Sequence, residues 1–264
     1  FIDEAAQAIE AACWIAISRA DRVILAGDHC QLPPTIKCIE AARGGLGRTL
    51  LEKVVLHKPE TMSLLKIQYR MHEDIMRFPS RWFYHDELEA APEVKYRGIL
   101  DFDTPVSWID TSELDLQEKA VAEGTGRLNT GEAELLVREL KNYMERIGIR
   151  RILEEHIDFG VISPYRAQVH YLRHLLKKEP FFRPCRRLIT VHTVDGFQGQ
   201  ERDVIMISLV RANEKGQIGF LRDLRRMNVA ITRARMKLLI LGEAVTLTRH
   251  PFYRELYEYI GGLR

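Results

Sequence analysis

The first residues that could do chemistry are two adjacent carboxylates, Asp3 and Glu4. They follow Phe1-Ile2 and precede Ala5-Ala6-Gln7, a pattern typical of the end of a buried strand. At such a position an Asp can hold Mg²⁺, and a neighbouring Glu can orient an attacking water molecule. Acidic pairs at strand ends are common, so the meaning of this pair depends on the segments that follow it.

A phosphate-binding loop would complete a site of this kind. The pattern Gly-x-x-x-x-Gly-Lys-Ser/Thr holds phosphates with its backbone N–H groups. The nearest match, Gly47-Arg48-Thr49, has Arg in place of Lys and Ala42 in place of the first Gly, so we interpret it as a turn into a helix around Leu50–Val55. The sequence therefore predicts the C-terminal part of a larger nucleotide hydrolase, inactive by itself, whose N-terminal half supplies the loop.

A second polar segment, Gly27-Asp28-His29-Cys30-Gln31-Leu32-Pro33-Pro34, follows the apolar run Arg22–Ala26. This order places Gln31 at the carboxyl edge of a parallel sheet, where ligands of α/β proteins bind. The Gln31 carboxamide can accept a hydrogen bond from water and donate one to a phosphate. A proline-stiffened turn is the alternative, and we interpret His29 as structural.

A third segment, Gln68-Tyr69-Arg70-Met71-His72, comes directly after the apolar run Ser63–Ile67. The planar guanidinium of Arg70 offers several donors to phosphate oxygens. Tyr69 offers a flat face to a base, although a tyrosine at a strand end often packs into the core instead.

The densest polar segment is His192-Thr193-Val194-Asp195-Gly196-Phe197-Gln198-Gly199-Gln200-Glu201. Glycines such as Gly199 allow a ligand to approach the backbone closely. Thr193 can bond a backbone phosphate, and Glu201 can accept from a ribose hydroxyl.

Two arginines end the segment Arg226–Arg235, which we predict to close a helix just before a strand. Arg233 and Arg235 are two residues apart, so on a helix they diverge and cannot both face one phosphate. One can supply positive charge to the transition state of phosphoryl transfer, and the other then stabilises the structure. A solvated basic helix end is the alternative.

Short apolar runs alternate with helical patterns along the chain, which predicts βαβ units and mostly parallel α/β sheets. The predicted strands are Arg22–Ala26, Ser63–Ile67, Gly98–Phe102, Val106–Ile109, Phe159–Ser163, Ile189–His192, Val204–Leu209 and Lys237–Leu241. The predicted helices include Glu132–Arg146, which begins with the capping-box pattern Asn129-Thr130-Gly131-Glu132, as well as Tyr165–Lys177 and Arg222–Thr232. The polar stretch Thr111–Leu128 predicts a mobile loop or insertion, and Pro92 with mixed charges predicts a domain boundary around Ala90–Arg97.

The composition, with 46% hydrophobic and 29% charged residues, is typical of soluble globular proteins. The sequence has no run of about 18 apolar residues, so it predicts no transmembrane helix. The net charge of +2 means that affinity for nucleic acid must come from local basic clusters. The clusters are Arg183, Arg186 and Arg187; Arg222, Arg225 and Arg226; and Arg233, Arg235 and Lys237. The spacing of Cys13, Cys30, Cys38 and Cys185 indicates reduced thiols and a cytoplasmic, intracellular location.

Taken in order, these segments resemble the superfamily-one RNA and DNA helicases, in the subgroup of the nonsense-mediated-decay helicase, the immunoglobulin mu-binding helicase and the Dna-two nuclease-helicase. The matching segments are Asp3–Gln7 (motif II), Gly27–Pro34 (motif III), Gln68–His72 (a hallmark of the subgroup), Val161-Ile162-Ser163-Pro164-Tyr165 (motif IV), Thr193–Glu201 (motif V) and Asn228–Arg235 (motif VI). Motifs I and Ia are absent from these residues.

The resemblance implies a partial first RecA-like domain, residues 1–92, with an incomplete sheet of about three strands, and a complete second RecA-like domain, residues 93–264. It implies ATP with Mg²⁺ in the cleft between the domains, single-stranded DNA or RNA across them, and 5′-to-3′ translocation. Asp3 would hold Mg²⁺, and Glu4 would activate water. Gln31, Arg70 and Arg233 would contact the γ-phosphate, Tyr69 the adenine and Glu201 the ribose, with Gly199 in the same nucleotide site. Pro164, Tyr165 and Thr193 would line the strand-binding face.

A second interpretation comes from a different functional class. The chain could be a non-catalytic nucleic-acid-binding module built on a degenerate RecA-like domain. Such a platform has no need of the five side chains that would face ATP: Asp3, Glu4, Gln31, Arg70 and Arg233. A signalling or transport ATPase would leave motifs IV and V unexplained. No residue visibly reads a 2′-hydroxyl, so DNA and RNA are equally open as partners.

Overall fold

The computed structural model describes residues 1–121 and 126–263. The chain forms two compact units, Phe1–Leu65 and Lys66–Arg264. None of the helices in the described residues combines the length and apolar character needed to span a bilayer.

The first unit consists of short elements around a very small core. Its helices are α1 (Glu10–Ile17), α2 (Ile39–Arg43), α3 (Leu50–His57) and the 3-10 turn η1 (Pro59–Thr61). Instead of the expected sheet of about three strands, the described residues of this unit contain one parallel bridge between Ile2 and Leu25. Beside it lies the core formed by Ala5, Ala6 and Leu51. Thr49 caps α3 with a complete capping box, which confirms the predicted turn into this helix.

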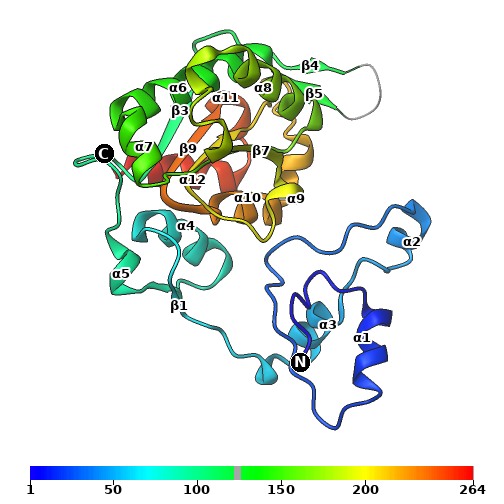
Figure 1. Ribbon diagram of the computed structural model, residues 1–264. Helices are drawn as coiled ribbons and strands as arrows, with labels where there is room; N and C mark the ends of the chain where they lie inside the picture. Colours follow the sequence, from blue (N-terminus) through cyan, green and yellow to red (C-terminus); the bar gives the residue numbers. More distant parts are fainter. Residues whose placement is uncertain (122–125, 264) are drawn as a thin grey trace. The chain divides into compact units, whose positions relative to one another are not determined.

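The second unit is built on a five-stranded parallel sheet with the order β3-β9-β8-β6-β7. Figure 1 labels β3, β9 and β7 of this sheet. The strands are β3 (Val106–Asp110), β6 (Phe159–Ser163), β7 (Ile189–Thr193), β8 (Arg202–Ser208) and β9 (Ala234–Gly242). Their continuous apolar runs suit strands that are covered on both faces. The sheet confirms the predicted parallel α/β class.

Helices cover both faces of this sheet. The helices α6 (Thr130–Ile147) and α8 (Arg166–Lys178) pack against each other, and α9 (Val194–Phe197) packs against α10 (Leu224–Ile231). The chain first advances across the sheet from β3 to β6 to β7, and right-handed crossovers then put α6 and α8 on one face. The chain next returns in the opposite direction to β8 and β9, so the same handedness puts α9 and α10 on the other face. Because all five strands are parallel, their carboxyl ends lie at one edge of the sheet and their amino ends at the opposite edge.

The remaining elements of the second unit are short or peripheral. They are β1 (Ile67–Gln68), α4 (Glu73–Phe83), β2 (Glu89–Ala90), α5 (Pro92–Lys95), β4 (Lys119–Ala120), β5 (Arg127–Leu128), α7 (Ile149–Glu154), η2 (Pro180–Phe182), η3 (Arg186–Leu188), η4 (Gly219–Arg222), α11 (Ala244–Leu247) and α12 (Pro251–Gly261). The short strands β4 and β5 pair antiparallel within the stretch that we expected to be a loop or insertion. Part of that expectation, residues 122–125, lies outside the described residues.

Within the second unit, the segment 66–92 packs against the rest of the unit through α4. The backbone N–H of His72 donates to the carbonyl oxygen of Arg235 (2.8 Å), and the ring of Phe78 lies 5.2 Å from that of Phe252 on α12. The compact unit therefore begins at Lys66, ahead of the boundary that Pro92 suggested. Pro92 interrupts the local pattern, but the apolar face of α4 needs α10 and α12 to cover it. The division into homologous domains at residues 92 and 93 stays a prediction.

Three of the predicted strands differ from the structure. Gly98–Phe102 was wrong, because its residues form turns in which the backbone N–H of Asp103 bonds the carbonyl oxygen of Leu100 (3.4 Å). Phe102 has a φ of +59° and is fully exposed, which no regular strand allows. Only Ile67 of the predicted strand Ser63–Ile67 enters a strand, and Arg22–Ala26 is reduced to the bridge at Leu25.

Candidate functional site

The first unit brings the Asp3-Glu4 pair beside the loop that carries Gln31. The backbone N–H of Ala5 donates to the carbonyl oxygen of Ala26 (2.8 Å), so the two segments run side by side. At Gly27 a Cβ atom would lie 2.8 Å from the backbone nitrogen of Ala6, a distance that real Cβ atoms do not reach. Glycine is therefore required for the two segments to meet.

Both carboxylates of this pair are exposed. Glu4 has a φ of +50°, a conformation that non-glycine residues adopt at a cost, and its backbone N–H donates to Oδ1 of Asp3 (2.9 Å). Gln7 Nε2 donates to Oε2 of Glu4 (2.6 Å). Mg²⁺ is usually bound by one or two carboxylates together with waters and substrate phosphates, and the exposed carboxylate of Asp3 has the chemistry of such a ligand.

Asp28 organises the Gln31 loop. Its Oδ1 accepts from the backbone N–H of Cys30 (2.9 Å), and its Oδ2 accepts from Nε2 of Gln31 (2.7 Å). The ligand atoms of Asp28, His29 and Cys30 lie within 4.8 Å of one another, but both oxygens of Asp28 already accept bonds inside the loop. The arrangement therefore fits a fixed loop that presents the Gln31 carboxamide better than it fits a metal site.

In the second unit, Arg70 joins three distant motifs. Its Nε donates to Oε2 of Glu201, and its Nη1 donates to the carbonyl oxygen of Thr232 (3.2 Å). Glu201 precedes β8 and Thr232 precedes β9, so these groups lie at the amino edge of the sheet. Gly199, which lies two residues before Glu201, is exposed. Its φ of +77° is a backbone conformation that glycine adopts without strain.

Tyr69 is 68% exposed, so the structure does not support packing in the core for this residue. Its loop is shaped by Gln68, whose Oε1 accepts from the backbone N–H groups of Arg70 (2.8 Å) and Met71 (2.7 Å). Sequence reasoning assigned no role to Gln68. The signal that could have found it is its position as the last residue of a strand before a polar segment.

Arg233 is buried just before β9. Its guanidinium donates to the carbonyl oxygens of Val229 (3.1 Å) and Gln200 (3.2 Å) and to Oγ1 of Thr232 (3.2 Å). These bonds hold the guanidinium against Gln200, the residue that precedes Glu201 in the sequence. Arg233 therefore belongs to the same edge of the sheet as Arg70.

Arg235 lies in strand β9, so the prediction that both arginines occupy a helix was wrong. Its Nη2 lies 3.0 Å from Oδ1 of Asp158, and its Nε lies 3.2 Å from Oδ1 of Asp203. Burial raises the pKa of Asp203, and the positive charge of Arg235 opposes that rise. These contacts agree with a stabilising role for Arg235.

The opposite, carboxyl edge of the sheet carries Pro164, Tyr165 and Thr193. Thr193 is the register partner of Ser163, so it lies beside the start of the Pro164-Tyr165 segment. The ring of Tyr165 is only 2% exposed and packs against Phe220. Tyr165 therefore packs against Phe220 and does not face solvent.

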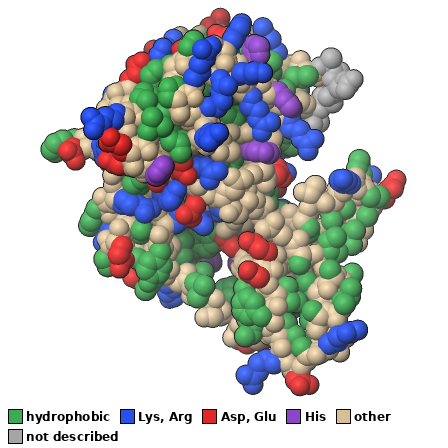
Figure 2. Space-filling model, viewed as in Figure 1, with side chains coloured by type: hydrophobic (Ala, Val, Ile, Leu, Met, Phe, Trp, Pro, Cys, Tyr) green, Lys and Arg blue, Asp and Glu red, His purple; other side chains and the backbone are tan. Residues whose placement is uncertain are grey.

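The three basic clusters differ in their exposure. Arg233 and Lys237 are buried, and burial lowers the pKa of Lys237, whose Nζ donates to the carbonyl oxygen of Thr104 (2.6 Å). Burial of two of its three members argues against this cluster as a source of affinity for nucleic acid. Arg225 and Arg226 both pair with Asp223. Arg183, Arg186 and Arg187 are exposed, and Figure 2 shows Lys and Arg side chains gathered on the second unit around α8.

Residues 46–245 match the family model described as AAA domain, and residues 1–38 match a second model with the same description. The chain belongs to the AAA domain family. Together with the relatives below, these matches confirm the resemblance to superfamily-one helicases that the ordered motifs predicted.

The relatives match almost all of the chain. It is 37% identical to the DNA-binding protein SMUBP-2 of Rattus norvegicus, covering 98% of this chain and 26% of that protein. It is 37% identical to the uncharacterized ATP-dependent helicase MJ0104 of Methanocaldococcus jannaschii (98% and 38%) and 35% identical to the regulator of nonsense transcripts 1 homolog of Drosophila melanogaster (98% and 22%). The chain thus spans between about a fifth and two fifths of the length of these relatives.

Proposed function

We propose that this AAA domain chain is the motor portion of an ATP-dependent helicase that moves 5′-to-3′ on single-stranded DNA or RNA. The observation that carries the proposal is the gathering of Arg70, Glu201 and Arg233 at the amino edge of the sheet, from three segments of the chain. Pro164 and Thr193 lie at the opposite edge. Two edges with different chemistry fit a protein that handles two different ligands, a nucleotide and a strand.

In this proposal each of the predicted side chains has a separate role. Exposed Asp3 would hold Mg²⁺, which supplies charge neutralisation to the phosphates when bound, and Glu4 would orient the attacking water. Gln31, held by Asp28, would contact the γ-phosphate together with Arg70 and Arg233. Glu201 would accept from the ribose.

The remaining parts of the nucleotide site concern the base and the phosphates. The exposed ring of Tyr69 would stack on adenine, and the turn at Gly199 would let the nucleotide approach the backbone. The sequence has no Gly-x-x-x-x-Gly-Lys-Ser/Thr segment. We propose that hydrolysis requires such a loop from a longer protein, and that these residues alone do not turn over ATP. The reduced thiols fit a protein that acts inside the cell.

The test is ATP hydrolysis by a protein in which this chain is joined to its phosphate-binding loop. We expect single strands to stimulate hydrolysis, and we expect unwinding of duplexes with a 5′ overhang but not of those with a 3′ overhang. Strand binding with no hydrolysis would favour the non-catalytic module instead. Unwinding from the 3′ overhang would contradict the direction only.

A further inference from the structure

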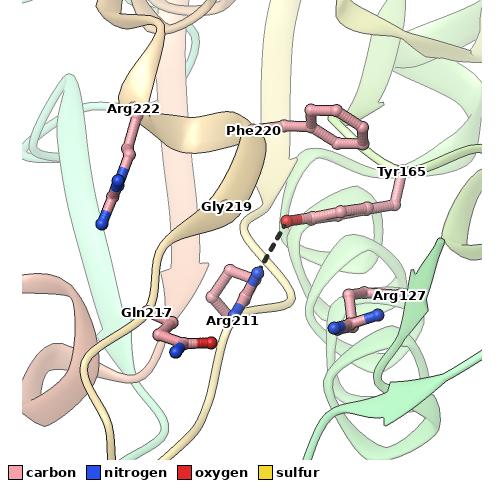
Figure 3. A pocket seen from close by; sticks show the side chains of 7 residues that line it. All are labelled: Arg127, Tyr165, Arg211, Gln217, Gly219, Phe220 and Arg222. Carbon is pink, nitrogen blue, oxygen red and sulfur yellow. Dashed lines mark hydrogen bonds between the residues drawn. The ribbon is translucent and has the colours of Figure 1, made fainter. Parts of the chain in front are cut away.

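A cavity of about 490 Å³ opens in the second unit at the carboxyl ends of β6 and β8. Ligand pockets of this size are common in proteins. Figure 3 shows it between the loop that follows β8 and the segment that follows β6. Its wall includes Arg127, Tyr165, Arg211, Gly219, Phe220 and Arg222.

The cavity is positively charged. Nε of Arg127 lies 3.4 Å from Oε1 of Glu118, and Nε of Arg211 lies 2.7 Å from Oε2 of the same carboxylate. One negative charge therefore faces two positive ones. Arg222, exposed at the rim, adds a third, and Figure 3 shows it on the side opposite Arg127. The excess of positive charge favours an anionic ligand.

The cavity also presents a flat apolar surface. Phe220 is 41% exposed, although its ring is held by two neighbours. The ring of Tyr165 lies 5.5 Å from it, and the guanidinium of Arg226 lies 5.8 Å from its centroid. A ring that is already fixed in place loses little freedom when a ligand stacks on it.

The backbone around the cavity is adapted to this arrangement. Gly219 has a φ of +56°, and a Cβ atom there would lie 2.3 Å from Nη1 of Arg211. Val210 has a φ of +70°, rare for a β-branched residue, and its N–H donates to Oε1 of Glu132 (2.9 Å). Backbone conformations of this cost persist only where the surroundings hold them.

We propose that this cavity binds one nucleotide of the single strand, with its base stacked on Phe220 and its phosphate paired with Arg222. The proposal rests on the proposed function. Single-strand-binding proteins combine basic grooves with aromatic platforms in this way. Because Thr193 and Pro164 lie at the same edge of the sheet, a strand that contacts them can continue into the cavity.

The first experiment measures the affinity of the 264-residue protein for fluorescent oligo(dT) and oligo(U) of about 15 nucleotides. Phe220→Ala should weaken binding about 5- to 150-fold, as expected for the loss of one stacked base. Phe220→Trp should bind like the parent, and the strand should quench the added indole. The matched control is Phe102→Ala, which removes a fully exposed phenylalanine elsewhere and should change nothing.

A second variant separates stacking from folding. Phe220→Leu keeps an apolar side chain against Tyr165 but removes the aromatic face, so it should lose affinity with an unchanged unfolding temperature. If folded Phe220→Ala and Phe220→Leu proteins bind strands as tightly as the parent, the proposal is overturned.

The phosphate contact is tested through the salt dependence of binding. Arg222→Ala should lower the slope of log K against log salt by about 0.7, the value for one phosphate contact to a single strand. The control Arg150→Ala makes the same change in net charge on exposed α7 and should leave the slope unchanged. Equal slopes for the parent and Arg222→Ala would contradict the assignment of this arginine.

Two further outcomes decide the ligand and its relation to the proposed function. If adenosine monophosphate competes as well as the oligonucleotides do, and Phe220→Ala abolishes that binding, the cavity serves a free nucleotide and the proposal fails. If the parent binds no single strand, the cavity proposal fails, whereas the proposed function is judged separately on the protein that carries the phosphate-binding loop. If strands stimulate hydrolysis but the Phe220 variants bind normally, only the cavity has been assigned wrongly.

Discussion

The guanidinium of Arg70 donates its Nε hydrogen to Oε2 of Glu201, which lies 131 residues further along the chain. This ion pair attaches the Gln68–His72 segment to the amino edge of the sheet in the second unit. The two side chains remain 36% and 41% exposed, so solvent screens the attraction between them. The pair is therefore better placed to exchange partners with a ligand than to hold the fold together.

Glu201→Gln should accordingly change the free energy of unfolding by less than about 1 kcal/mol, the range of exposed ion pairs. The Gln side chain keeps an acceptor for Arg70 and removes only the charge. Urea denaturation of the parent and the variant measures the difference. A loss of several kcal/mol would mean that the pair is structural and would weaken its assignment to the nucleotide.

Glu4→Gln, in a protein that carries the phosphate-binding loop, should bind ATP nearly as well as the parent and turn it over more slowly by orders of magnitude. The change keeps the shape of the side chain but removes the charge that orients water, so the loss falls mainly on kcat. Nucleotide affinity and steady-state hydrolysis are measured side by side. Hydrolysis at the parental rate would move the water-orienting role to another residue.

Arg233 and Arg235 should differ in their effect on hydrolysis, while both alanine variants should lose stability, because Arg233 is itself buried and bonded to Val229 and Gln200. Arg233→Ala should lower strand-stimulated hydrolysis by about 10³- to 10⁵-fold while single-strand binding persists. Arg233→Lys should also fail, because a lysine ammonium cannot reproduce a planar fork of donors.

The matched variant Arg235→Ala should lower the free energy of unfolding by about 1–3 kcal/mol, since it leaves the carboxylates of Asp158 and Asp203 without their shared cation. Hydrolysis rates and urea denaturation are compared for both alanine variants. If Arg235→Ala alone removes hydrolysis from a folded protein, the roles are reversed.

Glu132 should make the stability of the protein depend on pH. Its side chain is fully buried, and burial raises its pKa from 4.5 to about 7, against the bonds from Ser208 and Val210. The folded protein keeps a proton that the unfolded chain releases between pH 4.5 and 7, so stability should fall as the pH rises through this range, by about 3 kcal/mol in total.

Glu132→Gln should flatten that dependence, because Gln is neutral and its Oε1 can still accept from Ser208 Oγ and the N–H of Val210. The free energy of unfolding is measured for both proteins at several pH values between 5 and 8. Parallel curves for the parent and the variant would show that Glu132 is ionised throughout.

The packing of α4 predicts where the second unit can be cut. A chain of residues 66–264 should unfold cooperatively, whereas a chain of residues 93–264 should bind hydrophobic dyes and aggregate, because it exposes the surface around Phe252 that Phe78 covers. Thermal unfolding and light scattering of the two chains distinguish these outcomes. A well-folded 93–264 chain would place the independent unit at the boundary that Pro92 suggested.

The sequence determined the central sheet because strands covered on both faces must be continuously apolar. The predicted runs Val106–Ile109, Phe159–Ser163, Ile189–His192, Val204–Leu209 and Lys237–Leu241 all became strands of the parallel sheet. The polar segments at the ends of these strands were equally visible, because each one interrupts such a run. The order of those segments was enough to identify the family.

Only the tertiary structure decided which of these side chains face solvent. Tyr165 is buried and Phe220 exposed, although both are aromatic residues in polar segments, because Phe220 itself covers Tyr165. Arg233 is buried against backbone carbonyl groups, while Arg235 meets Asp158 and Asp203. Exposure and pairing depend on neighbours that are far away in the sequence, so a local pattern records the type of a residue but not its surroundings.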